Sequence, residues 1–186
     1  MMADDLLRTF GYSLVADGQG TPAMLIVFGG LPGVGKSTVS RAVACRLGAT
    51  YLRIDAVEQA ILRAVPSADP GTAGYEVAFA VAEANLELGH RVVADCVNPV
   101  LESRMAWRAI AERMSARLIE VEIICSDPDV HRRRIETRGG DILGHVLPTW
   151  DDVVSLRYDP WDRPPLVVDT GRVSVSSAID AILATI

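Results

Sequence analysis

A single loop constrains this chain more than any other feature. The segment from Gly30 to Ser37 reads GLPGVGKS and directly follows an apolar run over residues 23–29. A glycine-rich loop between a buried strand and a helix turns backbone N–H groups toward an anion, and the helix dipole adds positive potential. The spacing is that of the phosphate-binding P-loop. We therefore expect the chain to bind a nucleoside triphosphate.

Two side chains complete the motif. Lys36 brings a positive charge to the β- and γ-phosphates, and the Ser37 hydroxyl is a ligand for Mg²⁺. The alternative is a glycine-rich turn that carries Lys-Ser by coincidence, but the apolar residues from Val39 to Leu47 recur with helical spacing, as the motif requires. The predicted nucleotide-binding residues of this loop are Gly30, Leu31, Pro32, Gly33, Val34, Gly35, Lys36, Ser37 and Thr38.

Length and composition favour one compact domain. The 186 residues are 49% hydrophobic and 23% charged, which suits a single full core. The formal net charge of −6 argues against a general nucleic-acid binder, because such proteins carry a basic excess on one face. We expect a small-molecule partner instead, and the sequence does not indicate an oligomeric state.

Cysteine usage and hydropathy indicate a cytoplasmic protein. Cys45, Cys96 and Cys125 show no C-x-x-C spacing and are expected to be reduced core thiols rather than metal ligands. No apolar run approaches the roughly 18 residues that span a bilayer. Asp4 and Asp5 stand where a signal peptide would carry positive charge. We therefore expect no membrane association.

Strand-like and helix-like segments alternate along the chain. Residues 1–22 are predicted to be an N-terminal extension, and residues 23–186 one α/β domain. Nearly continuous apolar strands alternating with helices predict a parallel sheet covered on both faces, with right-handed crossovers. Pro99 after Asn98 and Pro128 after Asp127 are predicted to open helices behind a capping side chain. The predicted strands are 23–29, 50–54, 91–95, 118–124 and 165–169, and the predicted helices are 35–48, 56–64, 74–88, 100–115, 127–137, 150–157 and 175–185.

Three acids, Asp55, Asp95 and Asp169, follow predicted strands at the edge where ligands of such sheets bind, and two of them are site candidates. Asp55 is the candidate general base that orients an acceptor hydroxyl and takes its proton, and the alternative is a helix N-cap. Asp95 is the candidate Mg²⁺ ligand, held directly or through water, and the alternative is a capping or turn acid beside Asn98.

A basic segment is the third candidate. Arg134 and Arg138 lie one helical turn apart, before the glycine pair 139–140. Guanidinium groups on a mobile segment can stabilise a transferring phosphoryl group and exclude water, whereas the alternative is a solvated basic helix end. Arg132 and Arg133 are expected at the surface. No partner can be identified for His131 or His145.

Three aromatic residues, Trp150, Tyr158 and Trp161, lie beyond the basic segment. They would supply one wall of an acceptor pocket, because aromatic rings give rigid apolar area with a polar handle. The alternative, which we favour, is packing within the C-terminal part of the domain.

These motifs together resemble the P-loop kinases grouped with the zeta toxins, the gluconate kinases and the kinase domain of phage polynucleotide kinase. The resemblance runs from about residue 24 to residue 185. It implies a P-loop NTPase fold with a five-stranded parallel sheet and a helical lid. The segments that carry it are 30–37, Arg-Ile-Asp at 53–55, Val-Ala-Asp-Cys-Val-Asn-Pro at 93–99 with Arg104 and Trp107, and Cys-Ser-Asp-Pro-Asp-Val-His-Arg-Arg-Arg at 125–134 with Arg138.

The resemblance also implies roles. The acid at Asp55 would activate the acceptor hydroxyl, Arg134 and Arg138 would form the lid that contacts ATP, and the loop from Asp169 to Arg172, with Thr170, would border the adenine.

One position departs from these relatives. Polynucleotide kinases and many related enzymes have an arginine three residues after the acid, and this chain has Glu58 there. A carboxylate would repel a phosphate-bearing acceptor, which disfavours a nucleic-acid substrate unless Arg53, Arg63 or Arg104 compensates.

Three functions are consistent with these features. The leading hypothesis is a kinase that uses ATP and Mg²⁺ to phosphorylate a hydroxyl of a small molecule, such as a sugar, a sugar acid, an antibiotic-like metabolite or a nucleotide sugar. The alternatives are a nucleotide-dependent ATPase or switch that acts through protein partners, and a 5′-hydroxyl nucleic-acid kinase. No Asn-Lys-x-Asp element for guanine is present.

Overall fold

A computed structural model describes residues 22–66 and 69–186. The predicted N-terminal extension, residues 1–22, lies outside the described residues except for Pro22. The division of the chain at residue 22 therefore stays a prediction.

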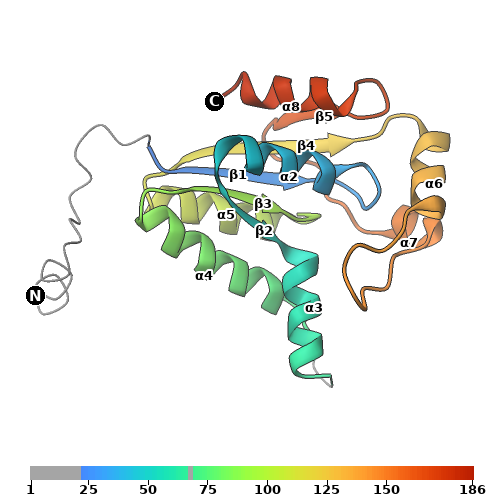
Figure 1. The fold of residues 1–186 in the computed structure, drawn as a ribbon, viewed down its shortest axis with the longest axis horizontal. Coiled ribbons are helices and arrows are strands. Elements are labelled where there is room, and N and C mark those ends of the chain that lie inside the picture. Colours follow the sequence, from blue (N-terminus) through green and yellow to red (C-terminus); the bar gives the residue numbers. More distant parts are fainter. Residues whose placement is uncertain (1–21, 67–68) are drawn as a thin grey trace, which may run out of the picture.

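Five parallel strands form one sheet in the order β2-β3-β1-β4-β5 (Figure 1). This confirms the predicted five-stranded parallel sheet. The consecutive strands β3 and β4 pair with opposite sides of the central strand β1, so the crevice at its carboxyl end is where a ligand binds in such folds. The strands are β1 (Met24–Gly29), β2 (Thr50–Arg53), β3 (Arg91–Asp95), β4 (Arg117–Ile124) and β5 (Leu166–Asp169).

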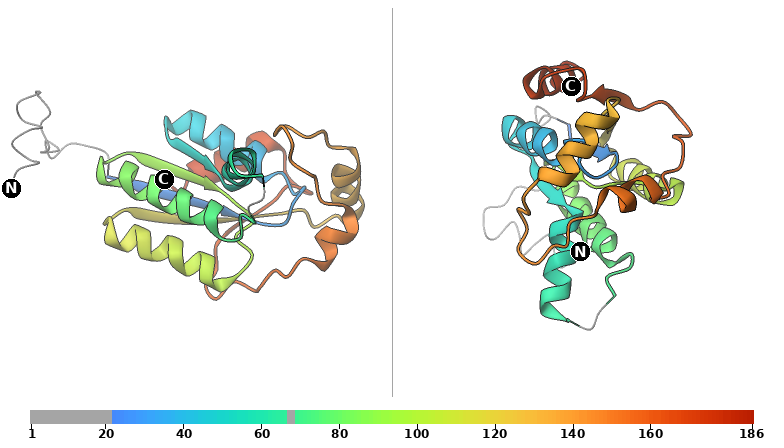
Figure 2. Two further views of the ribbon diagram at one scale, coloured as in Figure 1. Left: turned by 90° about the horizontal axis from the view of Figure 1, so that it is seen from below. Right: turned by 90° about the vertical axis from the view of Figure 1, so that its right-hand side faces the viewer.

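Helices cover both faces of the sheet. α2 and α8 pack on one face, and α4 and α5 on the other (Figures 1 and 2). α3 projects away from the sheet beside the start of α4, while α6 and α7 lie beyond the carboxyl ends of the strands. The helices are α2 (Lys36–Leu47), α3 (Ile54–Ala64), α4 (Ala73–Glu87), α5 (Leu101–Arg113), α6 (Pro128–Thr137), α7 (Trp150–Ser155) and α8 (Val175–Leu183).

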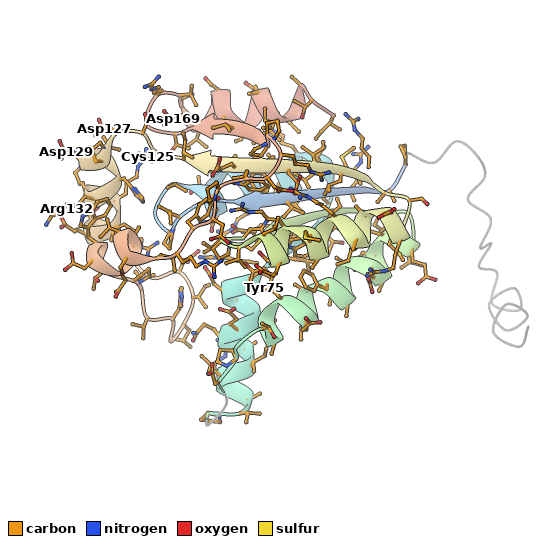
Figure 3. All side chains as sticks on the ribbon, turned by 180° about the vertical axis from the view of Figure 1, so that it is seen from behind. Tyr75, Cys125, Asp127, Asp129, Arg132 and Asp169 are labelled. Atoms are coloured by element: carbon orange, nitrogen blue, oxygen red, sulfur yellow. The ribbon has the colours of Figure 1, made fainter. Side chains whose placement is uncertain are left out.

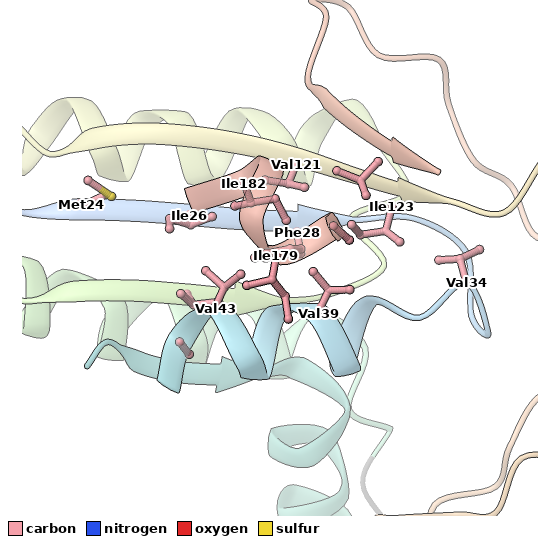
Figure 4. Close-up of a cluster of buried hydrophobic side chains, with 14 residues drawn as sticks. Met24, Ile26, Phe28, Val34, Val39, Val43, Val121, Ile123, Ile179 and Ile182 are labelled. Carbon is pink, nitrogen blue, oxygen red and sulfur yellow. The ribbon is translucent and has the colours of Figure 1, made fainter. Parts of the chain in front are cut away.

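Alternation along β1 explains why its whole run is apolar. Ile26 and Phe28 point into the layer formed with α2 and α8 (Figure 4), and Leu25 and Val27 point into the layer formed with α4 and α5. All four side chains are fully buried. A strand buried on both faces has no polar positions, so it loses the period-two pattern of a half-exposed strand.

One predicted helix start is wrong and another is right. Asp127 caps α6 with Pro128 in the first turn, as predicted. Asn98 instead adopts a left-handed φ of 51°, and α5 begins only at Leu101. The reason is that the carbonyls of Asn98 and Pro99 accept hydrogen bonds from Arg104, which holds both residues outside the helix.

The cysteine prediction is partly wrong. All three thiols are free, and Cys96 is buried, but Cys45 is exposed and Cys125 is partly exposed. Cys45 lies on the side of α2 that faces solvent, where its helical position rather than its polarity sets its exposure.

Arg104 fastens the segment after α7 to the body of the domain. Its guanidinium is completely buried and donates to the carbonyls of Pro160 at 2.9 Å and Asp159 at 2.8 Å. The rings of Trp161 and Tyr158 lie 4.2 Å and 5.2 Å from its central carbon. The favoured prediction for these two aromatic residues, packing, is therefore confirmed, and Arg104 has no free face for an acceptor.

Replacing Arg104 with methionine should destabilise the fold strongly. Four carbonyls around the buried guanidinium would lose a hydrogen-bond donor, so we expect the free energy of unfolding in urea to fall by about 3 kcal/mol or more. Arg113→Met is the control, because Arg113 is exposed on the same helix and should cost less than about 1 kcal/mol. A loss below about 1 kcal/mol for Arg104→Met would contradict this account.

Candidate functional site

A cavity of about 600 Å³ lies at the carboxyl ends of the strands. It is bounded by the P-loop, the ends of β2 and β3, the end of α6, the segment 138–148 and the loop after β5. The predicted site residues that line it are Pro32, Gly33, Gly35, Lys36, Ser37, Thr38, Asp55, Asp95, Arg134, Arg138 and Thr170, and those that do not are Gly30, Leu31, Val34 and Arg172.

The carbonyls of the P-loop are occupied by donors from the protein. Lys36 Nζ donates to the Leu31 carbonyl at 2.9 Å, and His131 Nε2 lies 2.8 Å from the Pro32 carbonyl. Thr170 Oγ1 donates to the Val34 carbonyl at 2.7 Å. In residues 22–66 and 69–186, the amide N–H groups of residues 33–35 donate to no protein acceptor. Such a concave set of free amides is an anion site.

Glycine is required at two loop positions. Gly30 has a φ of 130°, and an added Cβ would overlap the Ile123 carbonyl of β4. Gly33 has a φ of 82°, and an added Cβ would overlap the Ile135 side chain of α6. Gly30, which lies outside the cavity, thus serves the fit of the loop against the sheet, and Gly33 serves its fit against α6.

α6 holds the P-loop through residues that sequence reasoning missed. His131 is buried, reaches Pro32, and packs edge-on against Trp150 of α7 with ring centroids 5.2 Å apart. The favoured packing prediction for Trp150 is therefore confirmed. The spacing of His131 and Ile135, one helical turn apart, was the available signal, but the backbone acceptor of His131 is invisible in a sequence.

Arg134 is not a solvated helix end. Its guanidinium donates to Thr170 Oγ1 at 2.8 Å and to the Thr170 carbonyl at 3.0 Å. Because Thr170 also binds the P-loop, Arg134 links α6, the loop after β5 and the P-loop. Arg132, in contrast, lies on the outer side of α6 (Figure 3) and pairs with Glu136. The predicted surface position of Arg132 is confirmed.

Asp55 and Asp95 both line the cavity at the carboxyl ends of β2 and β3. Asp95 is buried at the end of β3 and accepts a 2.6 Å hydrogen bond from the Tyr51 hydroxyl. Asp55 lies within the first turn of α3, whose N-cap is Arg53, so the alternative of an N-cap at Asp55 is wrong. Its side chain is 36% exposed and faces the cavity.

Arg53 stands among three carboxylates. The sheet register places it directly opposite Asp95, with Nε 3.8 Å from Asp95 Oδ2, and its Nη2 lies 3.7 Å from Asp55 Oδ2. Its Nη1 donates to Asp141 Oδ2 at 2.6 Å. This guanidinium lies among the acids near the P-loop and reduces the repulsion between them.

The segment after α6 is tied down by Asp141. The same Asp141 oxygen is 3.2 Å from Arg41 Nη2, and the hydrogen bond from Arg53 lowers the pKa of Asp141 to about 2. Arg138, just before this segment, lines the cavity, and its Nε and Nη2 are buried without a partner in the described part of the chain. Burial lowers the pKa of Arg138. An unpaired, buried guanidinium is a site for an anion.

The residues present suit a nucleotide with Mg²⁺. Burial lowers the pKa of the Lys36 ammonium, and the carboxylates of Asp95 and Asp55 act in the opposite direction. Ser37 and Asp95 offer hard oxygen donors, which Mg²⁺ prefers. Among the described residues, no group of three or more His, Cys, Asp or Glu forms a complete cage, and Mg²⁺ in phosphate-transferring sites takes one or two protein ligands plus phosphates.

Arg172 and the remaining predictions lie elsewhere. Arg172 is exposed and pairs with Asp169 at 3.2 Å, beside the start of α6, where Figure 3 shows Asp127 and Asp169. Its predicted place at the adenine is untested. His145, for which the sequence showed no partner, lines the cavity. In the described ranges, no helix has both the length and the apolar character needed to cross a bilayer.

Comparison with known proteins identifies the family. A family model described as an AAA domain matches residues 25–147, which is more than half of the chain. A curated relative, the cytidylate kinase of Symbiobacterium thermophilum, is 30% identical over 147 residues. The match covers 72% of this chain and 63% of the relative, so this chain spans less than two thirds of the relative's length.

Solved kinase structures share the fold. A gluconokinase from Sinorhizobium meliloti superposes with a TM-score of 0.62 at 20% identity, covering 87% of this chain and 90% of that one. The APS kinase CysC of Mycobacterium tuberculosis, solved with AMPPNP and APS, superposes with a TM-score of 0.61 at 21% identity, covering 88% and 98%. The predicted fold and the resemblance to the P-loop kinase group are confirmed.

Gly33→Ala should weaken nucleotide binding. The left-handed φ and the overlap with Ile135 would force the loop or α6 to move, which typically costs 1–3 kcal/mol. We expect about tenfold or greater loss of affinity for Mg-AMPPNP by calorimetry. Gly140→Ala is the control, since nothing lies near an added Cβ there. Equal affinities of the two variants would contradict the proposed fit.

Asp141→Asn should loosen residues 139–149. Partly exposed ion pairs contribute about 0.2–1 kcal/mol, so amide hydrogen exchange there should quicken about two- to fivefold. With its pKa lowered to about 2, Asp141 stabilises the fold fully above its unfolded pKa and loses this effect as the pH falls through about 2. The ratio of exchange rates between Asp141→Asn and the wild type should therefore be the same at pH 7 and at pH 5. Asp180→Asn, on α8, should leave the segment unchanged.

Proposed function

The chain belongs to the AAA domain family, and from that membership and the cavity we propose that it is an ATP-dependent kinase that phosphorylates a hydroxyl group of a small molecule. The carrying observation is that free amides of the P-loop, two acids and an unpaired guanidinium surround one cavity. The relatives and structural neighbours named above are kinases, which supports this proposal.

The P-loop binds the phosphates in this proposal. The free amides of residues 33–35 and the Lys36 ammonium hold the β- and γ-phosphates, and the loop with Thr170 and Arg172 borders the adenine. Ser37 and Asp95 would hold Mg²⁺, which neutralises phosphate charge when bound.

Asp55 performs the proton transfer. Its carboxylate accepts the proton of the acceptor hydroxyl as that oxygen bonds to the γ-phosphorus and the bond to the ADP oxygen breaks. Arg138 stabilises charge on the transferred group, and Arg134 fixes the lid helix against Thr170. The side chains of the segment 139–148 exclude water from the cavity.

Asp55→Asn tests this assignment. Loss of the base should lower acceptor-dependent ADP release by about 10²–10⁴-fold, while the affinity for Mg-AMPPNP stays within about twofold. The assay compares sugars, amino sugars, sugar acids, antibiotics, nucleotide sugars and a 5′-hydroxyl oligonucleotide. Asp151→Asn, at an exposed position outside the cavity, is the control.

The outcomes separate the competing functions. Near-normal transfer by Asp55→Asn would remove Asp55 as the base. Release of ADP without any acceptor, together with nucleotide-dependent binding of a protein, would favour a switch instead. Phosphate transferred to the oligonucleotide would identify a nucleic-acid kinase.

A further inference from the structure

A second carboxyl group lies near Asp55 on the same helix. Glu58 lies one turn further along α3, and its side chain packs against Gly74 of α4, where an added Cβ would overlap it. Burial and the neighbouring Asp55 raise the pKa of Glu58. The glycine at 74 therefore leaves space for a second carboxyl group beside the proposed base.

Of the three arginines that would offset this charge, Arg104 and Arg53 are held by other groups, and Arg63 makes one exposed hydrogen bond. Arg104 is buried beneath the carbonyls of residues 98–99 and 159–160. Arg63 donates to the Leu143 carbonyl at 3.3 Å. Arg53 is held by Asp141 and flanked by Asp55 and Asp95. An anion on the acceptor would have to displace one of these contacts.

The remaining cations belong to the nucleotide. Lys36 and Arg138 line the cavity, and the proposed function uses both for the phosphates of the nucleotide. If Lys36 and Arg138 hold the nucleotide, a phosphate or carboxylate on the acceptor would approach Asp55, with Glu58 one turn along the same helix, and no other cation among the described cavity-lining residues is free of a carboxylate or carbonyl partner.

We infer that the acceptor is uncharged or cationic around its reacting hydroxyl, as in a polyol, a neutral sugar or an amino sugar, and carries no phosphate or carboxylate there. This inference rests on the proposed function and narrows its substrate class. The inferred acceptor therefore differs in charge from cytidylate, gluconate and APS, after which the relative and the structural neighbours above are named.

Binding of inorganic phosphate tests whether the part of the cavity around Asp55 tolerates an anion, and this test needs no known acceptor. With Mg-AMPPNP filling the nucleotide half, the wild-type protein should show no phosphate binding by calorimetry up to about 10 mM. Glu58→Arg should bind phosphate at least about tenfold more tightly than the wild type, and Glu58→Gln, which keeps the shape, should lie between. Glu87→Arg, at the exposed far end of α4, changes the net charge equally and should behave as the wild type.

Two results of this titration would overturn the inference. One is binding of phosphate to the wild-type protein with a dissociation constant below about 1 mM, at a site where phosphate does not compete with the nucleotide. The other is identical phosphate affinity of Glu58→Arg, Glu58→Gln and the wild type, provided that thermal melting shows all three to be folded.

Acceptor assays give a second, separate test. Acceptor-dependent ADP release should be greater with glucosamine or glucose than with gluconate, and absent with CMP. A preference for gluconate or CMP would overturn the inference while leaving the kinase proposal intact. Lack of transfer to acceptors of every charge, with Mg-AMPPNP bound tightly, would overturn the kinase proposal and this inference with it.

Discussion

The structure depends on how the carbonyls of the P-loop are satisfied. A loop that turns its amides toward an anion must place its carbonyls on the other side, where they need donors. His131 and Thr170 supply two of these donors from 99 and 136 residues further along the chain. The shape of the anion site therefore depends on tertiary contacts with α6 and with the loop after β5.

A second constraint is the balance of charge at the ends of β2 and β3. Two carboxylates in a partly buried site repel each other unless a cation lies between them. The parallel register sets Arg53 opposite Asp95, and the start of α3 brings Asp55 to the same guanidinium. Because Arg53 already offsets the charge of these acids, it is not available to a ligand. The number of arginines near the site therefore exceeds the number that can bind an anion.

Much of the fold could be predicted because its signals are local. Strands buried on both faces read as continuous apolar runs, and the P-loop has fixed spacing. The errors arise where a side chain meets a distant backbone group. Arg104 resembled a free cation and Asn98 a helix cap, because the carbonyls that engage Arg104 are set by the path of residues 156–161. The catalytic roles of Asp55 and Arg138 are still predictions, although the structure brings both to one cavity.

The segment between Arg138 and Trp161 is held unequally at its two ends. At its far end, Arg104 buries a full charge under four carbonyls, and α7 is fixed by the contact between Trp150 and His131. At its near end, Asp141 is half exposed and follows two glycines, so its ion pairs contribute only about 0.2–1 kcal/mol. Motion should therefore concentrate in residues 139–148, because the ion pairs of Asp141 are weak whereas α7 and the residues after it are held firmly. A ligand that contacts residues 139–148 needs only a small difference in binding free energy between two positions of this segment to shift it, because the ion pairs of Asp141 that oppose the shift are weak.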